Sequence, residues 1–532
     1  MSFKNFIKDS FDRVLAADSE YRYADDSKTI QEQVVCFVYK DIFTGDIFKF
    51  WEADKERSQS HFDWHNVLVV PFNAVAEGHS WLSLLHGKPN NIWDTYVENA
   101  RLYKTMRTGK GALNLLNTAH GYGINETMTK EQKDEERNIV IENKTYTAAQ
   151  RERILKYCLD DVELTEKIFL KQIADIEKKN NLKTEKDYKR ELTQIMFRGA
   201  SQLNVAVVER NGIPFDNELV NEFNTNWDNA KLHLIKKYNR LINVFDEHGI
   251  EKNKLFQDMV KRIGLFGEWP RTYRTGELVK DKKVIAKFSH IKEIRIYQKI
   301  KYFLNLTELS MFKPGRDGRM RTAFRMFGTE TGRCTPSTNT FVFSGSGWVR
   351  NFIKPSWGNW CAYLDYSQQE VAIQGYLSGD KKLMEVYRNG DVYINTAKIL
   401  GLVPDYATED SHPQERSICK TLFLAQGYGA GPGYVKLKIG CSMIKARHYL
   451  RLFKRIYRTY DTWINNQIKI SAMSGRMTTV YGWQRYLTEK EKQAEITKLG
   501  IVQDQIKKAK SEKDIDARDV GQQEKGRIKG GG

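Results

Sequence analysis

The first third of the chain alternates between strand-like and helix-like hydrophobic patterns. Four short apolar runs have the pattern of strands buried on one or both faces: 14–21 (VLAADSEY), 33–40 (QVVCFVYK), 46–53 (DIFKFWEA) and 66–74 (NVLVVPFNA). Residues 148–173 then carry apolar positions at helical spacing, which predicts a long amphipathic helix. This order of elements predicts an α/β domain over residues 1–170.

The remainder of the chain divides into three regions of different composition. Residues 171–325 are charged and mostly helical in pattern, and 232–245 form a clear amphipathic stretch. Residues 326–487 are richer in glycine, aromatics and short apolar runs. From residue 488 onward the sequence is highly charged and poor in aromatics, which predicts an exposed helix followed by partial disorder.

Composition excludes several classes of protein. The 532 residues are 40% hydrophobic and 29% charged, without an apolar run long enough to span a membrane. Six scattered cysteines contain no CxxC pair, which argues against a zinc site and a disulfide framework and favours the cytoplasm. The formal net charge of +18 suggests a polyanionic partner, and nucleic acid is the commonest one.

Three spaced pairs of polar residues lie within the predicted α/β domain. Asp18 and Glu20 are two residues apart on a strand and therefore share a face. Asn73 and Glu77, and Tyr157 and Asp161, are each four residues apart, which is about one helical turn. Each pair alone is common by chance and is better explained as exposed surface.

Together and in this order, the three pairs resemble the motifs of the DEDD 3′–5′ exonucleases, whose domain has a ribonuclease H-like fold. The resemblance implies that Asp18, Glu20 and Asp161 bind metal and that Tyr157 orients the attacking water. Such a site hydrolyses phosphodiesters with two divalent ions, Mg²⁺ or Mn²⁺. This sequence has Glu77 where the family usually has Asp; we expect an active site, with an effect on rate.

A second set of residues lies on the helix predicted over 411–428, with Ser411 as its N-cap. Arg416, Lys420, Leu424 and Tyr428 recur every four residues and therefore form one stripe. The two cations could hold a triphosphate at one end of this stripe. The apolar and aromatic side chains could hold the sugar and the base at the other end. The alternative is a basic surface helix, but Leu424 and Tyr428 continue the cationic stripe beside three glycines, which argues against it.

Four segments resemble successive landmarks of family A DNA polymerases. They are TETGRCTPS (329–337), YLDYSQQE (363–370), RSICKTLFLAQGYG (416–429) and TVYGWQRYL (479–487). With the exonuclease motifs, the resemblance covers roughly residues 12–487. It implies an α/β exonuclease domain followed by an α+β right-hand polymerase: connector and thumb at 171–325, incomplete palm and fingers at 326–487, and a charged tail at 488–532.

The resemblance assigns catalytic and nucleotide-binding roles. Asp365 would bind both catalytic metals, with the carbonyl of Tyr366 as a further ligand. Glu370 would pack beside the incoming sugar and help to reject a 2′-hydroxyl. Arg416 and Lys420 would hold the triphosphate, and Lys420 could protonate the leaving pyrophosphate.

Further positions are expected to contact nucleotide or DNA. Tyr428 would lie by the templating base, Arg333 would reach the minor groove of the primer end, and Arg485 would contact DNA. Two positions depart from the family. Leu424 replaces Phe or Tyr, which predicts altered discrimination against dideoxynucleotides, and Tyr393 replaces a phosphate-contacting His.

One expected element is missing from the sequence. Family A enzymes supply a second metal-binding Asp from a His-Asp-Glu turn near the C-terminus, but here no histidine is followed by aspartate. Asp514, Asp516 and Asp519 lie in the charged tail and are expected to be solvated surface. Either a separate C-terminal polymerase fragment completes the palm, or the polymerase is degenerate and retains only exonuclease activity and DNA binding.

The leading interpretation is therefore a template-directed DNA polymerase with a proofreading 3′–5′ exonuclease. The alternative is a stand-alone exonuclease with a polymerase-inactive DNA-binding region. Expected partners are primer–template DNA, single-stranded 3′ ends and dNTPs, with no membrane. The short stretch ahead of Asp18 leaves no room for a 5′-nuclease domain, which suits a phage-type replicative enzyme in the host cytoplasm.

Overall fold

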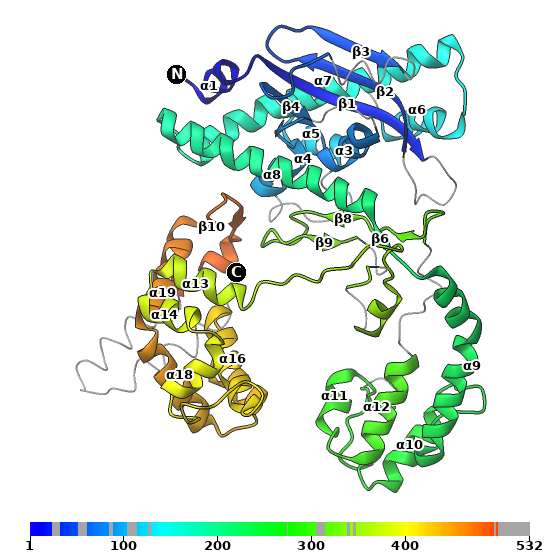
Figure 1. Ribbon diagram of the computed structural model, residues 1–532, viewed down its shortest axis with the longest axis vertical. Helices are drawn as coiled ribbons and strands as arrows, with labels where there is room; N and C mark the ends of the chain where they lie inside the picture. The colour runs from blue at the N-terminus through cyan, green and yellow to red at the C-terminus, as the bar shows by residue number, and fades with distance from the viewer. Residues whose placement is uncertain are drawn as a thin grey trace.

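The computed structural model describes most of the chain. The described residues are 1–23, 32–51, 61–83, 89–103, 114–125, 129–273, 275–304, 314–337, 341–343, 347–493 and 496–497. A sheet domain forms one end of the molecule, and two helical units lie below it on opposite sides (Figure 1). The predicted tail at 488–532 lies almost wholly outside the described residues.

The N-terminal domain is built on a five-stranded sheet. Its strands are β1 (Arg13–Tyr23), β2 (Glu32–Asp41), β3 (Ile47–Trp51), β4 (Val67–Pro71) and β5 (Asn91–Ile92). Their order is β3-β2-β1-β4-β5; β2 is antiparallel to β1 and β3, whereas β1, β4 and β5 run parallel. The four strands predicted from hydrophobic pattern are confirmed. β1 lies at the centre of the sheet, so its side chains are covered from both faces.

Helices cover the two faces of this sheet. They are α1 (Phe3–Ser10), α3 (Ala74–Ser83), α4 (Thr95–Tyr103), α5 (Leu115–Gly121), α6 (Lys130–Glu142), α7 (Ala148–Lys179) and α8 (Glu185–Asn211). A capping box between Thr147 and Gln150 begins α7 and confirms the predicted start of the long helix. Residue 170, expected to be a domain boundary, falls inside α7. The domain continues through α8, because Leu192, Ile195 and Leu203 are buried in its core.

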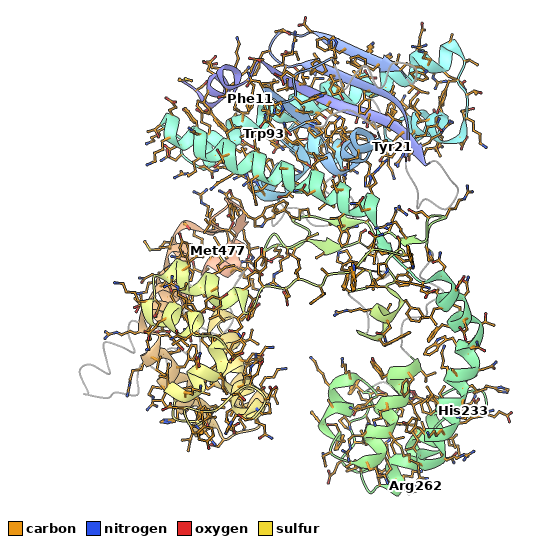
Figure 2. All side chains as sticks on the ribbon, viewed as in Figure 1. Phe11, Tyr21, Trp93, His233, Arg262 and Met477 are labelled. Atoms are coloured by element: carbon orange, nitrogen blue, oxygen red, sulfur yellow. The ribbon has the colours of Figure 1, made fainter. Side chains whose placement is uncertain are left out.

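A separate helical unit follows α8. It contains α9 (Asn217–Ile242), α10 (Asn253–Arg262), α11 (Lys282–Lys287) and α12 (Lys292–Leu304). These helices enclose their own core around Phe256 and Tyr297, both fully buried. His233 and Arg262, labelled in Figure 2, lie on this unit, away from the sheet domain. Residues 232–242 of the predicted amphipathic stretch lie in α9, whereas Val244 and Phe245 follow the helix and pack into the same core.

Short paired strands and a 3₁₀ helix connect this unit to the rest. β6 (Ile213–Pro214) pairs with β7 (Arg319–Met320), and β8 (Phe324–Arg325) pairs with β9 (Thr335–Pro336). The 3₁₀ helix spans Gly347–Phe352 and contributes Val349 and Phe352 to a small core. After it, residues 356–367 run as an extended and almost fully exposed segment.

The last unit is helical with one hairpin. It contains α13 (Gln369–Ser378), α14 (Lys381–Arg388), α15 (Val392–Ile399), α16 (Pro413–Gly427), α17 (Pro432–Ile439), α18 (Met443–Ile456) and α19 (Arg458–Ser474). The hairpin of β10 (Arg476–Thr478) and β11 (Gln484–Tyr486) lies beneath α8 (Figure 1). In the described part of the chain, no helix is long and apolar enough to cross a membrane.

Candidate active sites

The sheet domain gathers the acidic residues predicted from its three motifs. Asp18 and Glu20 point to the same side of β1, and their carboxylate oxygens lie within 4.8 Å of each other and of the Cys158 sulfur. The charge of Asp18 acts on the Glu77 carboxyl, and Asp161 is close enough to act electrostatically on both β1 carboxylates. Tyr21, labelled in Figure 2, marks the end of β1 at which this acidic cluster lies.

The position of Glu77 follows from local backbone chemistry. Asn73 has φ +78°, a left-handed conformation that asparagine tolerates, and it turns the chain from β4 into α3. Asp94 then joins two helix starts, because its Oδ2 accepts from the Ala74 N–H at 2.7 Å and its Oδ1 from the Val97 N–H at 3.0 Å. Glu77 consequently lies in the first turn of α3, buried and facing β1.

Burial and mutual repulsion raise the pKa values of these acids. Burial, reinforced by the charge of Asp161, raises the pKa of Asp18 to about 7. Burial and the charge of Asp18 raise the pKa values of Glu20 and Glu77 well above those of ordinary glutamates. Burial, together with the same acids, also raises the pKa of Tyr157, so its hydroxyl keeps its proton at neutral pH.

Other residues of this site were not predicted from sequence. Lys133 of α6 forms an ion pair with Asp161, and its ammonium lies 5.7 Å from the centre of the Tyr157 ring. The Cys158 thiol donates to Asp18 Oδ2 at 3.3 Å. Cys158 precedes Asp161 by three residues on α7, so helical spacing could have suggested it, whereas Lys133 is brought in only by the packing of α6 on α7.

This cluster fits a divalent cation. Among the described residues, Asp18, Glu20 and Cys158 are the one group of three or more side chains spaced to share a metal ion. Glu77 Oε2 is buried with no hydrogen-bond partner among the described residues, and a bound cation would satisfy this oxygen. Hard cations take carboxylate oxygens, and a bound cation would relieve the repulsion that raises these pKa values.

Arg416, Lys420 and Leu424 of the predicted stripe lie on α16, but this helix does not begin where the sequence predicted. α16 begins at Pro413 after His412, and Ser411 is not its cap; its hydroxyl instead lies 2.8 Å from His412 Nδ1. Lys420 is exposed and Leu424 is half-buried on α16. Tyr428 is the first residue after the helix and remains partly exposed.

Arg416 is held by acidic neighbours that the sequence analysis did not select. Both its Nε and Nη2 donate to Asp391 Oδ2, at 2.9 and 2.6 Å, and its Nε lies 3.3 Å from Glu409. Asp391 also caps α15 through the backbone N–H groups of Tyr393 and Ile394. The guanidinium of Arg416, which was expected to bind phosphate, is therefore paired with the Asp391 carboxylate in this structure.

Tyr393 lies beside the same guanidinium. The guanidinium of Arg416 is 5.2 Å from the centre of the Tyr393 ring, and the ring packs edge-on against Phe423. Tyr393 is 9% exposed, and burial raises its pKa. It is thus positioned mainly by core packing, with its ring face toward a cation.

A second polar group joins three predicted residues. Glu370, in the first turn of α13, lies 3.0 Å from Arg333 Nη2 and accepts from the Tyr428 hydroxyl at 3.2 Å. Arg485 is separate from this group, because it pairs with Glu330 at 3.1 Å and Glu491 at 2.9 Å. Of the predicted DNA-contacting residues, Arg333 and Tyr428 are brought together and Arg485 is not.

The apolar run CAYL (361–364) directly before Asp365 has the pattern of a buried strand, but the structure forms no strand there. Residues 361–366 belong to no strand among the described residues, and both Leu364 and Tyr366 are exposed, at 91% and 79%. Asp365 is itself exposed, and within the ranges that the structure describes it belongs to no group of three or more potential metal ligands. The apolar run CAYL has the pattern of a strand, but the described chain offers it no partner strand to pair with.

Comparison with known proteins places these features in a class. Residues 251–505 match the family model described as DNA polymerase family A. This part of the chain is therefore similar to the polymerase domain of that family. Over 92% of this chain and 82% of the other, the structure resembles the solved "POL domain of Pol1 from M. smegmatis complex with DNA primer-template and dNTP", with TM-score 0.61 and 15% identity. At that identity the likeness concerns the fold.

Named relatives agree with this assignment. The chain is 26% identical over 266 residues to "DNA polymerase I, thermostable" of Thermus aquaticus, covering 47% of this chain and 31% of that protein. It is 29% identical over 178 residues to "DNA polymerase I" of Synechocystis sp., covering 32% of this chain and 18% of that protein. The chain thus spans less than a third of the length of either relative.

Proposed function

We propose that this protein is a template-directed DNA polymerase with a 3′–5′ proofreading exonuclease. The observation that carries the proposal is the convergence of Asp18, Glu20, Glu77, Tyr157 and Asp161 in a domain joined to a family A polymerase domain. A phage-type replicative role and a location in the host cytoplasm belong to the proposal and rest on the sequence alone.

The exonuclease assignment is supported by the sheet and by its acids. A central strand with acidic residues, flanked by an antiparallel strand and two parallel strands, agrees with a ribonuclease H-like domain. Asp18, Glu20 and Asp161 would hold Mg²⁺ or Mn²⁺, and two such ions would activate water and stabilise the leaving oxygen. Tyr157 keeps its proton and can donate a hydrogen bond that orients the water or the scissile phosphate.

The polymerase assignment is supported by the cationic stripe. Lys420 is exposed on α16 and available for a triphosphate, one turn beyond Arg416. An incoming triphosphate would take the place of Asp391 and Glu409 on Arg416, since guanidinium binds phosphate and carboxylate through the same fork of N–H groups. The Glu370–Arg333–Tyr428 group would then border the sugar and the primer end.

We further propose that a strand-forming segment from outside the described residues completes the metal site at Asp365. Trp357 and Trp360 are 100% and 95% exposed at and just after a turn that Asn359 N–H closes to the Ser356 carbonyl, and Leu364 is 91% exposed in the segment without secondary structure that follows. Exposed apolar surface of this kind marks an interaction site, and an extended segment with unpaired backbone accepts an added strand. A separate polypeptide carrying an apolar hairpin with a carboxylate at its turn would supply both the pairing strand and the second metal ligand.

One observation favours the alternative function. Because Asp365 is exposed and belongs to no group of three or more potential metal ligands in the described part of the chain, the chain by itself would bind primer–template and degrade 3′ ends without extending them. The alternative is therefore a 3′–5′ exonuclease with a polymerase-inactive DNA-binding region.

The test is primer extension by the full chain with Mg²⁺, a 5′-labelled primer–template and four dNTPs, in the Asp18→Ala/Glu20→Ala variant. Extension would establish polymerase activity in this chain alone. Binding without extension would favour the alternative, unless an added hairpin peptide restores synthesis. The matched control is Glu218→Ala/Glu222→Ala, which removes two exposed acids from α9 and should leave the degradation of a 5′-labelled single strand unchanged. Degradation by the Asp18/Glu20 variant at the wild-type rate would refute the exonuclease assignment.

A further inference from the structure

A basic and aromatic groove lies where the sheet domain meets the C-terminal unit. It has a cavity volume of about 430 Å³ and is lined along α8 and by the turn between β10 and β11. Its lining includes Lys186, Lys189, Arg190, Gln194, Phe197 and Tyr481. Met477, labelled in Figure 2, is on β10 just before this turn, beneath α8. We call this feature the α8 groove.

The cations of the α8 groove form one stripe. Lys189 and Arg190 follow Lys186 by three and four residues, and all three are exposed. They therefore project from the same face of α8. None of the described side chains that line the groove is acidic. Arg190 has an exposed ion pair with Asp187 at 3.3 Å, which is weak in water. The groove therefore presents net positive charge to solvent.

The far end of the stripe carries two stacked aromatic rings. Phe197 and Tyr481 lie with their centroids 4.7 Å apart and their planes 15° from parallel. Phe197 is nevertheless 49% exposed and Tyr481 59% exposed. Large apolar side chains at the surface usually have a partner, and a half-open pair of stacked rings is a surface on which a base can stack.

Buried charges hold this aromatic pair in place. The Arg198 guanidinium donates to the Tyr481 carbonyl at 2.7 Å and is paired with Glu98 at 2.6 Å, and both side chains are almost fully buried. Gln194 donates to the Val480 carbonyl at 3.0 Å. The turn that carries Tyr481 is thus attached to α8 by fixed contacts, so a ligand would find the rings already positioned and would not have to order them.

We infer that the α8 groove binds single-stranded DNA, with phosphates along Lys186, Lys189 and Arg190 and a base stacked on the Tyr481–Phe197 pair. A row of cations ending in an aromatic platform is the arrangement by which proteins hold single strands without sequence preference. No residue assigned above to either active site lines the groove, so this inference does not depend on the proposed function.

The test measures binding of fluorescein-labelled dT₁₂ to the full chain by anisotropy, in EDTA to prevent metal-dependent degradation. Aromatic stacking contributes about 1–3 kcal/mol per base, so Phe197→Ala/Tyr481→Ala should weaken binding about 5- to 150-fold. Lys186→Ala/Lys189→Ala should reduce the log–log salt slope by about 1.4, at about 0.7 per phosphate of a single strand.

Matched controls separate the groove from general charge and aromatic effects. Lys171→Ala/Lys178→Ala removes two exposed lysines from α7, and Tyr273→Ala/Tyr406→Ala removes two exposed rings; both should retain wild-type binding. An rU₁₂ strand tests whether RNA is bound equally. Equal losses in the groove and control variants would overturn the inference.

A site-specific readout avoids interference from strands bound elsewhere. An oligonucleotide containing 5-iododeoxyuridine, irradiated in the complex, should form crosslinks to Tyr481 or Phe197 that peptide mass spectrometry can locate. The Tyr481→Leu variant keeps an apolar side chain and should fold, but it should lose the crosslink at residue 481. Crosslinks found only outside the α8 groove would refute the assignment.

Discussion

The acidic cluster predicts an unusual effect of Asp18→Asn on stability. Since the folded state raises the pKa of Asp18 from 3.8 to about 7, it holds the protonated form more tightly than the unfolded chain does. The stability contributed by this group is therefore intact below about pH 3.8 and is lost as pH rises to about 7. Removing the charge should stabilise the metal-free protein at pH 8.

The magnitude follows from the pKa values. A rise from 3.8 to about 7 corresponds to about 4 kcal/mol, at about 1.4 kcal/mol per pH unit. Asp18 is half-buried, and solvent screening reduces this to about 2 kcal/mol. For a domain of this size, about 2 kcal/mol raises the Tm by about 4–8 °C.

Differential scanning calorimetry in EDTA at pH 4.5 and pH 8 tests this prediction. The Asp18→Asn variant should melt later than wild type at pH 8 and close to wild type at pH 4.5. Added Mg²⁺ should raise the Tm of wild type more than that of the variant, because the cation binds the carboxylate. The contrasting variant is Asp41→Asn, which loses the ion pair at 3.2 Å between its buried carboxylate and the partly exposed Arg13 and should melt earlier. A lower Tm for Asp18→Asn at pH 8 in EDTA would refute the reasoning.

Three further predictions concern the rest of the chain. Glu98→Gln removes the buried partner of two buried arginines and should cost about 3–5 kcal/mol, measured by urea unfolding. Glu409→Gln removes an exposed competitor of phosphate on Arg416 and should lower the KM for dNTP about 2- to 5-fold in steady-state extension, with kcat unchanged; a raised KM would contradict this role. Trp360→Asp should leave the Tm within about 1 °C because the side chain is 95% exposed, yet should abolish any restoration of synthesis by an added hairpin; retained restoration would exclude this surface.

Hydrophobic periodicity predicted the strands and helices correctly where an element's own residues define its buried face. The strands around Asp18 and the helices α7 and α16 lie where their apolar spacing predicted, because each buries a face that its own residues define. Asp18 and Glu20 share one side of β1, since a two-residue step on a strand returns to the same face.

Contacts between residues far apart in the chain could not be predicted from periodicity. Lys133 beside Asp161, Asp391 on Arg416, and the buried network of Glu98 with Arg198 all join residues more than 20 positions apart. No local pattern encodes such a contact. The same holds for the α8 groove, whose two sides lie almost 300 residues apart in the chain.

Residues 361–366 illustrate the division between the two kinds of information. Their composition alone determined that the segment could form an apolar strand ending at Asp365. Only the tertiary structure decided that it does not pair within the described residues and remains exposed. The physical reason is that a strand is stabilised by hydrogen bonds to a neighbour, so its own sequence gives the capacity to pair, whereas the rest of the fold must supply the partner.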